Sequence, residues 1–186
     1  VYPPFTNVPK GNGRNVLYNP LIRVEDGGYR MDFDNLEAVA SRDDAKLMIL
    51  CNPHNPCGIA WDRASLAKVA DICLRHNVLV VSDEIHADMP LSGTVHIPFA
   101  TVSEAAAMNS ITFGAPSKTF NMAGIVSSFS IVPNDKIREE FYTWMDVNEL
   151  NSPTIFATGA TIAAYTKGGE WRGDMLEYIE ENVNFT

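Results

Sequence analysis

Short apolar runs punctuate the chain, and each is followed by a polar or turn-forming cluster. Runs rich in β-branched and aliphatic residues extend from Lys46 to Cys51, from Asn77 to Ser82 and from Ser110 to Phe113. Continuous apolar runs of this length, bounded by turn residues, are typical of strands buried on both faces. The pattern therefore predicts three buried strands, each ending at a group of polar side chains.

The segment between the first two runs has helical periodicity from Asp62 to His76. Its apolar positions recur three or four residues apart, at Leu66, Val69, Ala70 and Cys73. Asp62 can cap the start of this helix and Asn77 can close its end. A strand, a helix and a second strand in this order predict two parallel strands joined by a right-handed crossover.

The remaining segments add a fourth strand and several helices. The run from Ile125 to Val132 predicts a strand. Shorter periodic segments predict helices over Asp34 to Ser41, over Ser103 to Met108 and from Pro133-Asn134 through Val147.

Two more helices follow toward the end of the chain. Ser152-Pro153 predicts a helix start and Gly168-Gly169 its stop. The residues between are mostly small or apolar on every side, which predicts a buried helix. Glu170 to Asn182 predicts an amphipathic helix whose apolar stripe consists of Trp171, Met175, Tyr178 and Ile179.

Composition narrows the classes of partner. The 186 residues are 46% hydrophobic, enough for one substantial core. The formal net charge of -9 argues against binding to nucleic acid or to an anionic membrane. No apolar run approaches the roughly 20 residues that span a bilayer. The three cysteines, an odd number in a chain of this size, favour reduced thiols over a disulfide framework. A soluble, cytoplasmic protein is expected.

Three polar clusters follow the predicted strands. The first extends from Asn52 to Gly58 (Asn-Pro-His-Asn-Pro-Cys-Gly), the second from Ser82 to His86 (Ser-Asp-Glu-Ile-His) and the third from Ala115 to Asn121 (Ala-Pro-Ser-Lys-Thr-Phe-Asn). Ligands of open α/β sheets bind beyond the carboxyl ends of the strands. We therefore expect Asn55, Asp83 and Lys118 to share one crevice.

These clusters resemble those of pyridoxal-phosphate (PLP) enzymes of the aspartate aminotransferase fold type, and more narrowly the cystathionine β-lyase-like carbon-sulfur lyases. The resemblance implies an α/β fold built as a three-layer α/β/α sandwich, with a mainly parallel sheet and one antiparallel strand from Ile125 to Val132. It also implies that Lys118 holds the cofactor aldehyde as a Schiff base, Asp83 pairs with the pyridine nitrogen and Asn55 donates to the phenolate oxygen.

Further cofactor contacts follow from the same resemblance. His86 stands where many relatives carry a tyrosine near the phenolate oxygen, and Ser117 resembles a phosphate contact. Tyr2, in Val-Tyr-Pro-Pro-Phe, resembles the aromatic residue that stacks on the pyridine ring. Each has a simpler reading, respectively a histidine at a helix start, a serine in a turn and an ordinary tyrosine near a chain end.

The resemblance also implies an activity and an assembly. A carbon-sulfur β-lyase would cleave cystathionine or a similar cysteine S-conjugate to pyruvate, ammonia and a thiol, as a homodimer. Transamination of an amino-acid substrate is the alternative, because it uses the same residues. A catalytically inert fragment or regulatory module is a second alternative.

A zinc site is a competing hypothesis for part of the first cluster, since zinc accepts the ligand types of Cys51, His54, Cys57 and His76. Pro53 and Pro56 constrain that segment, however, and no metal site is expected.

The domain organisation implied is incomplete. Residues 1–168 correspond to part of the large PLP-binding domain, and residues 169–186 to a helix that leads toward a small domain outside this sequence. In the resembled family, the turn that grips the phosphate precedes Val1 and the arginine that binds the substrate carboxylate follows Thr186. A fragment of a longer protein is therefore expected.

Overall fold

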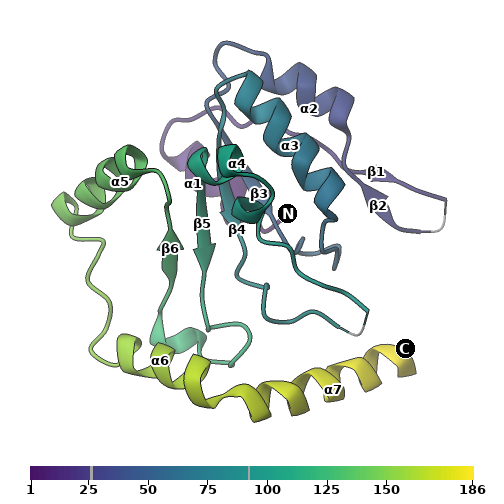
Figure 1. Ribbon diagram of the computed structural model, residues 1–186, viewed down its shortest axis with the longest axis vertical. Helices are drawn as coiled ribbons and strands as arrows, with labels where there is room; N and C mark the ends of the chain where they lie inside the picture. Colours follow the sequence, from purple (N-terminus) through teal and green to yellow (C-terminus); the bar gives the residue numbers. More distant parts are fainter. Residues whose placement is uncertain (26, 92) are drawn as a thin grey trace.

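A four-stranded sheet forms the centre of the computed structural model, which describes residues 1–25, 27–91 and 93–186 (Figure 1). Its strands lie in the order β3 (Leu47–Cys51), β4 (Leu79–Asp83), β5 (Ser110–Gly114) and β6 (Phe129–Ile131). The first three are parallel, and β6 pairs antiparallel with β5. The predicted α/β fold with a mainly parallel sheet and one antiparallel strand is confirmed.

One face of the sheet is covered by α2 (Phe33–Ala40), α3 (Arg63–Arg75) and α4 (Glu104–Met108). The core between these helices and the sheet contains Leu66, Val69, Cys73, Val80 and Phe99, all essentially inaccessible to solvent. The cap predicted for α3 is present: the Asp62 side chain accepts a hydrogen bond from the Ser65 amide at 2.7 Å.

The opposite face of the sheet is covered in part by α5 (Asp135–Val147). The ring of Phe141 packs edge-on against Phe113 of β5, with 5.8 Å between centroids. The Tyr142 hydroxyl lies 2.7 Å from the Ser130 hydroxyl of β6. Helices thus contact both faces of the sheet, as the three-layer expectation requires.

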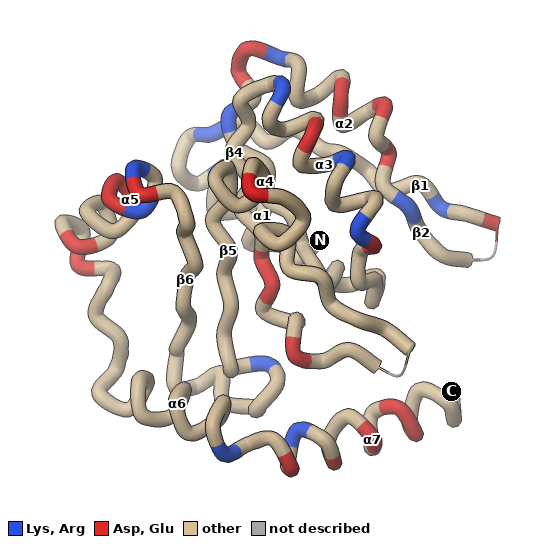
Figure 2. The backbone as a smooth tube through the Cα atoms, in the orientation of Figure 1, with Lys and Arg blue, Asp and Glu red and all other residues tan. Residues whose placement is uncertain are grey.

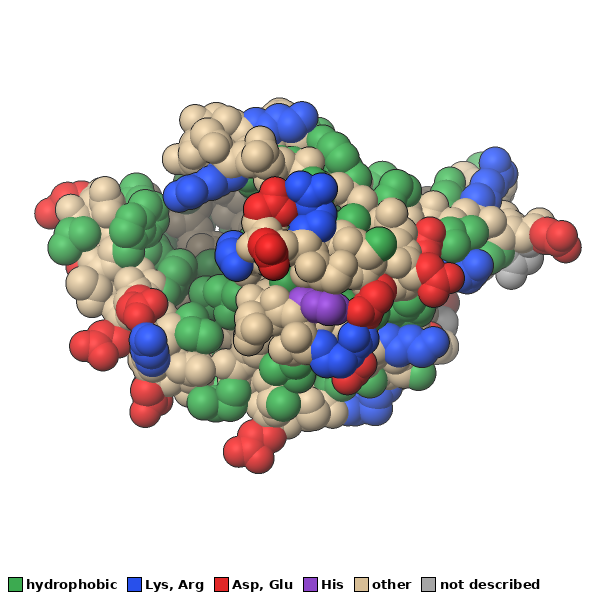
Figure 3. All heavy atoms as spheres, turned by 90° about the horizontal axis from the view of Figure 1, so that it is seen from above, with side chains coloured by type: hydrophobic (Ala, Val, Ile, Leu, Met, Phe, Trp, Pro, Cys, Tyr) green, Lys and Arg blue, Asp and Glu red, His purple; other side chains and the backbone are tan. Residues whose placement is uncertain are grey.

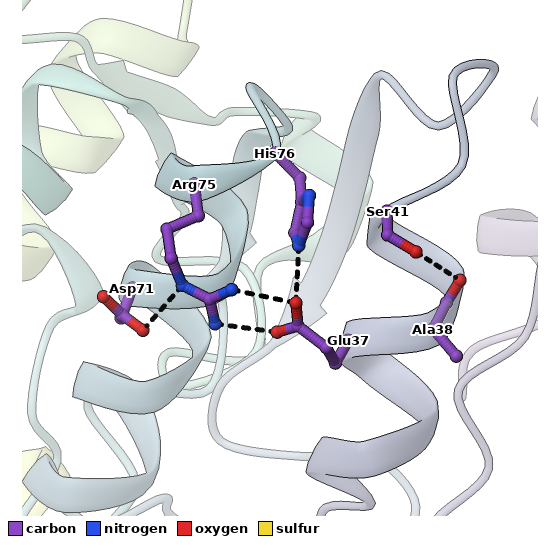
Figure 4. Close-up of polar contacts among 6 residues, drawn as sticks. All are labelled: Glu37, Ala38, Ser41, Asp71, Arg75 and His76. Atoms are coloured by element: carbon purple, nitrogen blue, oxygen red, sulfur yellow. Dashed lines mark hydrogen bonds and ion pairs between the residues drawn. The ribbon is translucent and has the colours of Figure 1, made fainter.

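Helices α2 and α3 are joined at the surface by a charged cluster (Figure 4). The Arg75 guanidinium donates to both carboxylate oxygens of Glu37, at 2.7 and 2.8 Å, and also reaches Asp71 at 3.1 Å. His76 Nε2 lies 2.6 Å from the same Glu37 carboxylate. Figure 3, viewed from the side of α2 and α3, shows acidic and basic side chains beside one another on this face.

Two long helices cross the carboxyl ends of the parallel strands, namely α6 (Ala157–Lys167) and α7 (Gly169–Phe185). The helix start predicted at Ser152-Pro153 is wrong, because the Thr154 hydroxyl donates to the Ile125 carbonyl and holds that segment outside the helix. The predicted burial of α6 is also wrong: Ile162 is 58% exposed, and Ala157 alone is buried among the residues of this helix.

The strand predicted over Ile125 to Val132 is shorter than expected. Ala123–Ile125 form a 3-10 turn, η2, and Val126 adopts a left-handed backbone with φ 52°. An extended strand cannot continue through a residue in that conformation. Pairing with β5 therefore involves only Phe129–Ile131.

Several elements were not predicted from the sequence. They are the helix α1 (Pro4–Gly11), the two-residue strands β1 (Ile22–Arg23) and β2 (Tyr29–Arg30), which pair antiparallel, and the 3-10 turn η1 (Phe99–Thr101). The hairpin is too short to leave a period-two pattern. In the described part of the chain, no helix has both the length and the apolar character that a bilayer crossing demands.

Candidate active site

The register of the parallel strands brings the three predicted loops to one edge of the sheet. Cys51 pairs with Asp83, and Asp83 with Phe113. The ladder continues just beyond the strand ends, where the Asn52 amide donates to the Asp83 carbonyl at 3.0 Å and the Glu84 amide donates to the Phe113 carbonyl at 2.8 Å. The loops after β3, β4 and β5 therefore leave the sheet side by side (Figure 1).

Asp83 ends β4 with a partly buried carboxylate. Its Oδ1 accepts a hydrogen bond from the Ile85 amide at 3.2 Å. Burial raises the pKa of this carboxyl above its ordinary value, while the Ile85 amide and the charges of His86 and Lys118 act in the opposite direction. Asp83 is therefore an acid in a partly desolvated site, with the charge of Lys118 favouring its ionised form and that of Glu84 opposing it.

Lys118 lies in a tight turn that follows β5. The Phe120 amide donates to the Pro116 carbonyl at 2.9 Å, and the Met122 amide donates to the Ser117 carbonyl at 3.0 Å. The lysine itself is exposed, and its charge acts on both Asp83 and His86. In Figure 2 this loop lies at the same end of the sheet as the turn after β4. The structure thus brings an amine and a carboxylate to one region from positions 35 residues apart in the printed sequence.

The loop after β3 carries Asn55 and is anchored to the end of that strand. The Asn55 amide donates to the Cys51 sulfur at 3.2 Å. The Trp61 indole donates to the Cys51 carbonyl at 3.0 Å, and its ring packs against His54. Burial raises the pKa of the Cys51 thiol. Asn55 is therefore held beside the strand end that pairs with Asp83.

His86 lies in the turn after Asp83 and is half-buried. Burial lowers the pKa of its imidazole, with Lys118 acting in the same direction and Asp83 opposing it. A neutral imidazole at pH 7 follows from the lowered pKa, because the ordinary value is already below 7. His86 can therefore serve as a hydrogen-bond partner without adding a positive charge.

Tyr2 and Ser117 are the two remaining predicted residues. The Tyr2 ring is 49% exposed and packs edge-on against Phe5 at 6.0 Å. Val1 lies near Cys51 and His54, at the end of β3. Ser117 is adjacent to Lys118 and partly buried. Within the described residues, neither hydroxyl has a hydrogen-bond partner that would fix its role.

Several residues that support this site were not identified from the sequence. Phe120, two positions after Lys118, packs against Tyr165 of α6 and Trp171 of α7, with centroids 5.7 and 6.0 Å apart. The Tyr165 hydroxyl lies 3.1 Å from the Asp88 carboxylate, and Arg172 donates to the Asp88 carbonyl at 2.6 Å. These contacts connect the two loops through α6 and α7, and a single sequence holds no signal for such pairs.

The zinc alternative is not supported by the arrangement of its ligands. His76 lies at the end of α3, where it contacts Glu37. Across residues 1–25, 27–91 and 93–186, no three His, Cys, Asp or Glu side chains are grouped so that they could hold a metal ion. The three cysteines are free thiols.

Two surface hollows are lined by other residues than Asn55, Asp83 and Lys118. One, of about 500 Å³, is at the β1–β2 hairpin, and another, of about 300 Å³, is bordered by Phe33, Trp61 and Ser65. Neither has Lys118 or Asp83 in its walls. The loops that carry Asp83 and Lys118 thus lie at the carboxyl ends of the parallel strands, which α6 and α7 cross.

Comparison with known proteins identifies similar chains and folds. The family model described as "Aminotransferase class I and II" matches residues 1–183. The chain is 47% identical over 184 residues to "Cystathionine beta-lyase PatB" of Bacillus subtilis (strain 168), an alignment that covers 99% of this chain and 47% of that protein. The chain spans about half the length of the relatives it matches.

Two solved structures extend the comparison. Cystalysin from Treponema denticola, which contains pyridoxal 5'-phosphate, superposes with a TM-score of 0.96 at 34% identity, covering all of this chain and 47% of that one. The PLP-bound C-S lyase from Staphylococcus hominis superposes with a TM-score of 0.90, also at 34% identity, covering 99% of this chain and 46% of that one.

Proposed function

The chain belongs to the class I and II aminotransferase family, and from this we propose that the complete protein is a PLP-dependent carbon-sulfur β-lyase. Its substrate would be cystathionine or a similar cysteine S-conjugate, cleaved to pyruvate, ammonia and a thiol. The observation that carries the proposal is the strand register, which brings the loops of Asn55, Asp83 and Lys118 side by side at the carboxyl ends of parallel strands. The 47% identity to a cystathionine β-lyase supports the choice of reaction.

The groups at this edge fit the chemistry of PLP. A primary amine can hold the cofactor aldehyde, and a carboxylate can hold a proton on the pyridine nitrogen; Lys118 and Asp83 supply these groups. Asn55, beside the end of β3, offers an amide donor to the phenolate oxygen. The structures of two relatives contain the cofactor. When bound, PLP supplies an electron sink that stabilises negative charge at the substrate's Cα.

The residues of this chain account for the proton movements. With PLP bound, the Lys118 amine would accept the proton from the substrate's Cα. The ionised Asp83 keeps the ring nitrogen protonated, which its hydrogen bond from Ile85 favours. His86 and Asn55 can hold the phenolate oxygen in place. The Cβ–S bond then breaks, the sulfur leaves as a thiolate and takes up a proton, and water converts the remaining three-carbon enamine to pyruvate and ammonia.

The assembly and location are part of the proposal. Residues 1–168 would form part of the large cofactor-binding domain, and 169–186, which contain all of α7, would lead to a small domain. We propose a homodimer, as in the resembled family, and a cytoplasmic location, where Cys51, Cys57 and Cys73 would remain reduced. Tyr2 would stack on the cofactor ring and Ser117 would contact its phosphate.

The test uses the complete protein incubated with cystathionine and PLP, without a keto acid. Release of pyruvate and thiol in equal amounts supports the lyase. Product that forms only after a keto acid is added supports the aminotransferase alternative, which needs the same residues up to removal of the α-proton. Neither product, with no visible absorption band from bound PLP, supports an inert module.

A matched pair of lysine variants identifies the residue responsible. Lys118→Ala should abolish both the visible band and pyruvate release. Lys136→Ala removes an exposed lysine of α5, 85% accessible, and should leave both unchanged. Retention of the band in Lys118→Ala would exclude Lys118 as the residue that holds the cofactor.

A further inference from the structure

Glu84 carries a buried carboxylate next to the predicted cofactor-binding acid. Its side chain is 5% exposed. Side chains alternate between the faces of a strand, so Ser82 and Glu84 point to the face covered by α3 while Asp83 points to the other. A hydrogen bond of 2.8 Å between the Ser82 hydroxyl and Glu84 Oε1 is consistent with this alternation. The Glu84 side chain therefore lies on the α3 side of the sheet and does not border the crevice at the strand ends.

Both oxygens of the Glu84 carboxylate have partners. Oε1 accepts from the Ser82 hydroxyl and from the Phe99 amide at 2.9 Å. Oε2 lies 2.8 Å from His96 Nε2, and the His96 side chain is only 8% exposed. Since an ionised carboxylate can only accept, Nε2 must be the donor in this contact. A buried carboxylate needs such partners, and the hydrogen bonds to both oxygens fix its position, while His96 Nδ1 is buried without a partner among the described residues.

The network fixes both ends of the loop that carries His86 and Asp88. Glu84 is its first residue, and His96 and Phe99 lie at its far end. At the near end, the Asp83 carbonyl accepts from Asn52, just beyond β3, and the Glu84 amide donates to Phe113 of β5. The Ala87 amide donates to the Glu84 carbonyl at 2.9 Å. The direction of the Asp83 carboxylate, whose Oδ1 is bonded to Ile85, thus depends on a turn that Glu84 holds.

We propose that Glu84 is a positioning residue, which orients Asp83 by tying the following loop to His96, Ser82 and Phe99. The inference rests on the proposed function, because it assumes that Asp83 pairs with the cofactor ring nitrogen. A purely structural role would not need a charge, since an apolar side chain of similar volume can replace a buried ion pair without loss of stability. The carboxylate also stands close to Asp83, where its charge opposes ionisation of that acid. A glutamate at this position is best explained by the geometry it enforces.

The experiment is a double-mutant cycle in the complete, PLP-loaded protein. Glu84→Met should lower kcat with cystathionine by about 10- to 100-fold with little change in KM, because small displacements of a reacting group have effects of that size. It should also alter the visible circular dichroism of bound PLP. In an Asp83→Asn background the same change should cost less than about threefold, because the group that Glu84 orients is already lost.

The controls separate positioning from folding. Glu84→Gln keeps an acceptor oxygen for Ser82 and Phe99 and should retain more activity than Glu84→Met. Glu139→Met, at an exposed site on α5, should behave as the unaltered protein. If Glu84→Met does not fold, His96→Leu takes the place of that variant in the double-mutant cycle, because it removes the partner of Glu84 Oε2.

The outcomes are distinct. Additive effects of the Glu84 and Asp83 substitutions, or an unchanged circular dichroism band in a folded Glu84→Met protein with reduced activity, would overturn the positioning role and leave the lyase proposal intact. Absence of a visible band and of pyruvate release in the unaltered protein would overturn both.

Discussion

Phe120 and Tyr165 pack edge to face with ring centroids 5.7 Å apart and planes at 82°, which ties the loop of Lys118 to α6. Phe120 also contacts Trp171, so the same ring meets both long helices. Gly168, between these helices, allows the close approach, because a Cβ there would lie 2.6 Å from the Phe120 ring and 2.5 Å from the Ala164 carbonyl oxygen. The position of the lysine loop is thus set by residues that follow Phe120 by 45 to 51 positions in the printed sequence.

Replacement of Phe120 should loosen the lysine loop. Phe120→Ala removes a half-buried aromatic side chain, and we expect a loss of about 2 kcal/mol in the free energy of unfolding, below the value for a fully buried phenylalanine. The affinity for PLP should fall as well, because Lys118 loses its support. Denaturant titration and equilibrium dialysis measure the two effects. Unchanged PLP affinity in the destabilised variant would show that the loop holds its shape without this ring.

Replacement of Asp83 should have opposite effects on stability and on cofactor binding. Because burial raises the pKa of Asp83, its ionised form is disfavoured in the folded state, and stability is lost as the pH rises through the folded pKa. Asp83→Asn removes that cost but keeps an acceptor for the Ile85 amide. The cofactor-free variant should therefore be more stable than the unaltered protein at pH 7, with the difference vanishing below the unfolded pKa near 3.8.

The same Asp83→Asn variant should bind PLP less tightly and lose most of its lyase activity, because an amide does not hold a proton on the ring nitrogen. Denaturation curves of the cofactor-free protein at pH 3 and pH 7 test the effect on stability. Absorption titrations with PLP test the effect on cofactor binding. Lower stability of the variant at pH 7 would contradict the assigned direction of the pKa shift.

The charged cluster between α2 and α3 predicts a pH dependence of stability. Arg75 and then His76 lower the pKa of Glu37 to about 2 from the ordinary 4.5, through their hydrogen bonds. A lowered carboxyl pKa gives stability that is fully present above pH 4.5 and is lost as the pH falls toward 2. Glu37→Gln should therefore reduce the melting temperature at pH 7 and at low salt, and much less at pH 2.

Glu139→Gln is the matched control, because Glu139 is exposed on α5 and has no ion-pair partner in the part of the chain that the structure describes. Equal effects of the two substitutions at pH 7 would mean that the cluster in Figure 4 adds nothing beyond a general change in net charge.

Trp61 predicts a stability effect at the Asn55 loop. Trp61→Phe keeps most of the ring but removes the indole donor, so that the Cys51 carbonyl loses its partner at 3.0 Å. We expect a loss of about 1 to 3 kcal/mol, the usual cost of leaving a buried acceptor unpaired. Trp144→Phe, at a position 57% exposed on α5, should change stability by less than about 0.5 kcal/mol. Equal losses in a denaturant titration would refute the importance of the indole bond.

The sequence by itself determined the elements whose local pattern is strong. The apolar runs ending at Cys51, Ser82 and Phe113 became adjacent strands, because short apolar runs bounded by turn residues favour strands of a parallel sheet. The helix capped by Asp62 formed where the 3.6-residue period predicted it. The motifs around Asn55, Asp83 and Lys118 also predicted that their loops meet at one edge of the sheet, and the strand register confirms this meeting.

Only the tertiary structure decided what supports that edge. The contacts of Phe120 with Tyr165, of Tyr165 with Asp88 and of Glu84 with His96 join side chains whose spacing in the chain follows no local rule. The late start of α6 likewise depends on a bond from Thr154 to Ile125, which lies in a different element. Periodicity records which face of an element is apolar, whereas the partner that each polar or aromatic group meets is set by how distant elements pack.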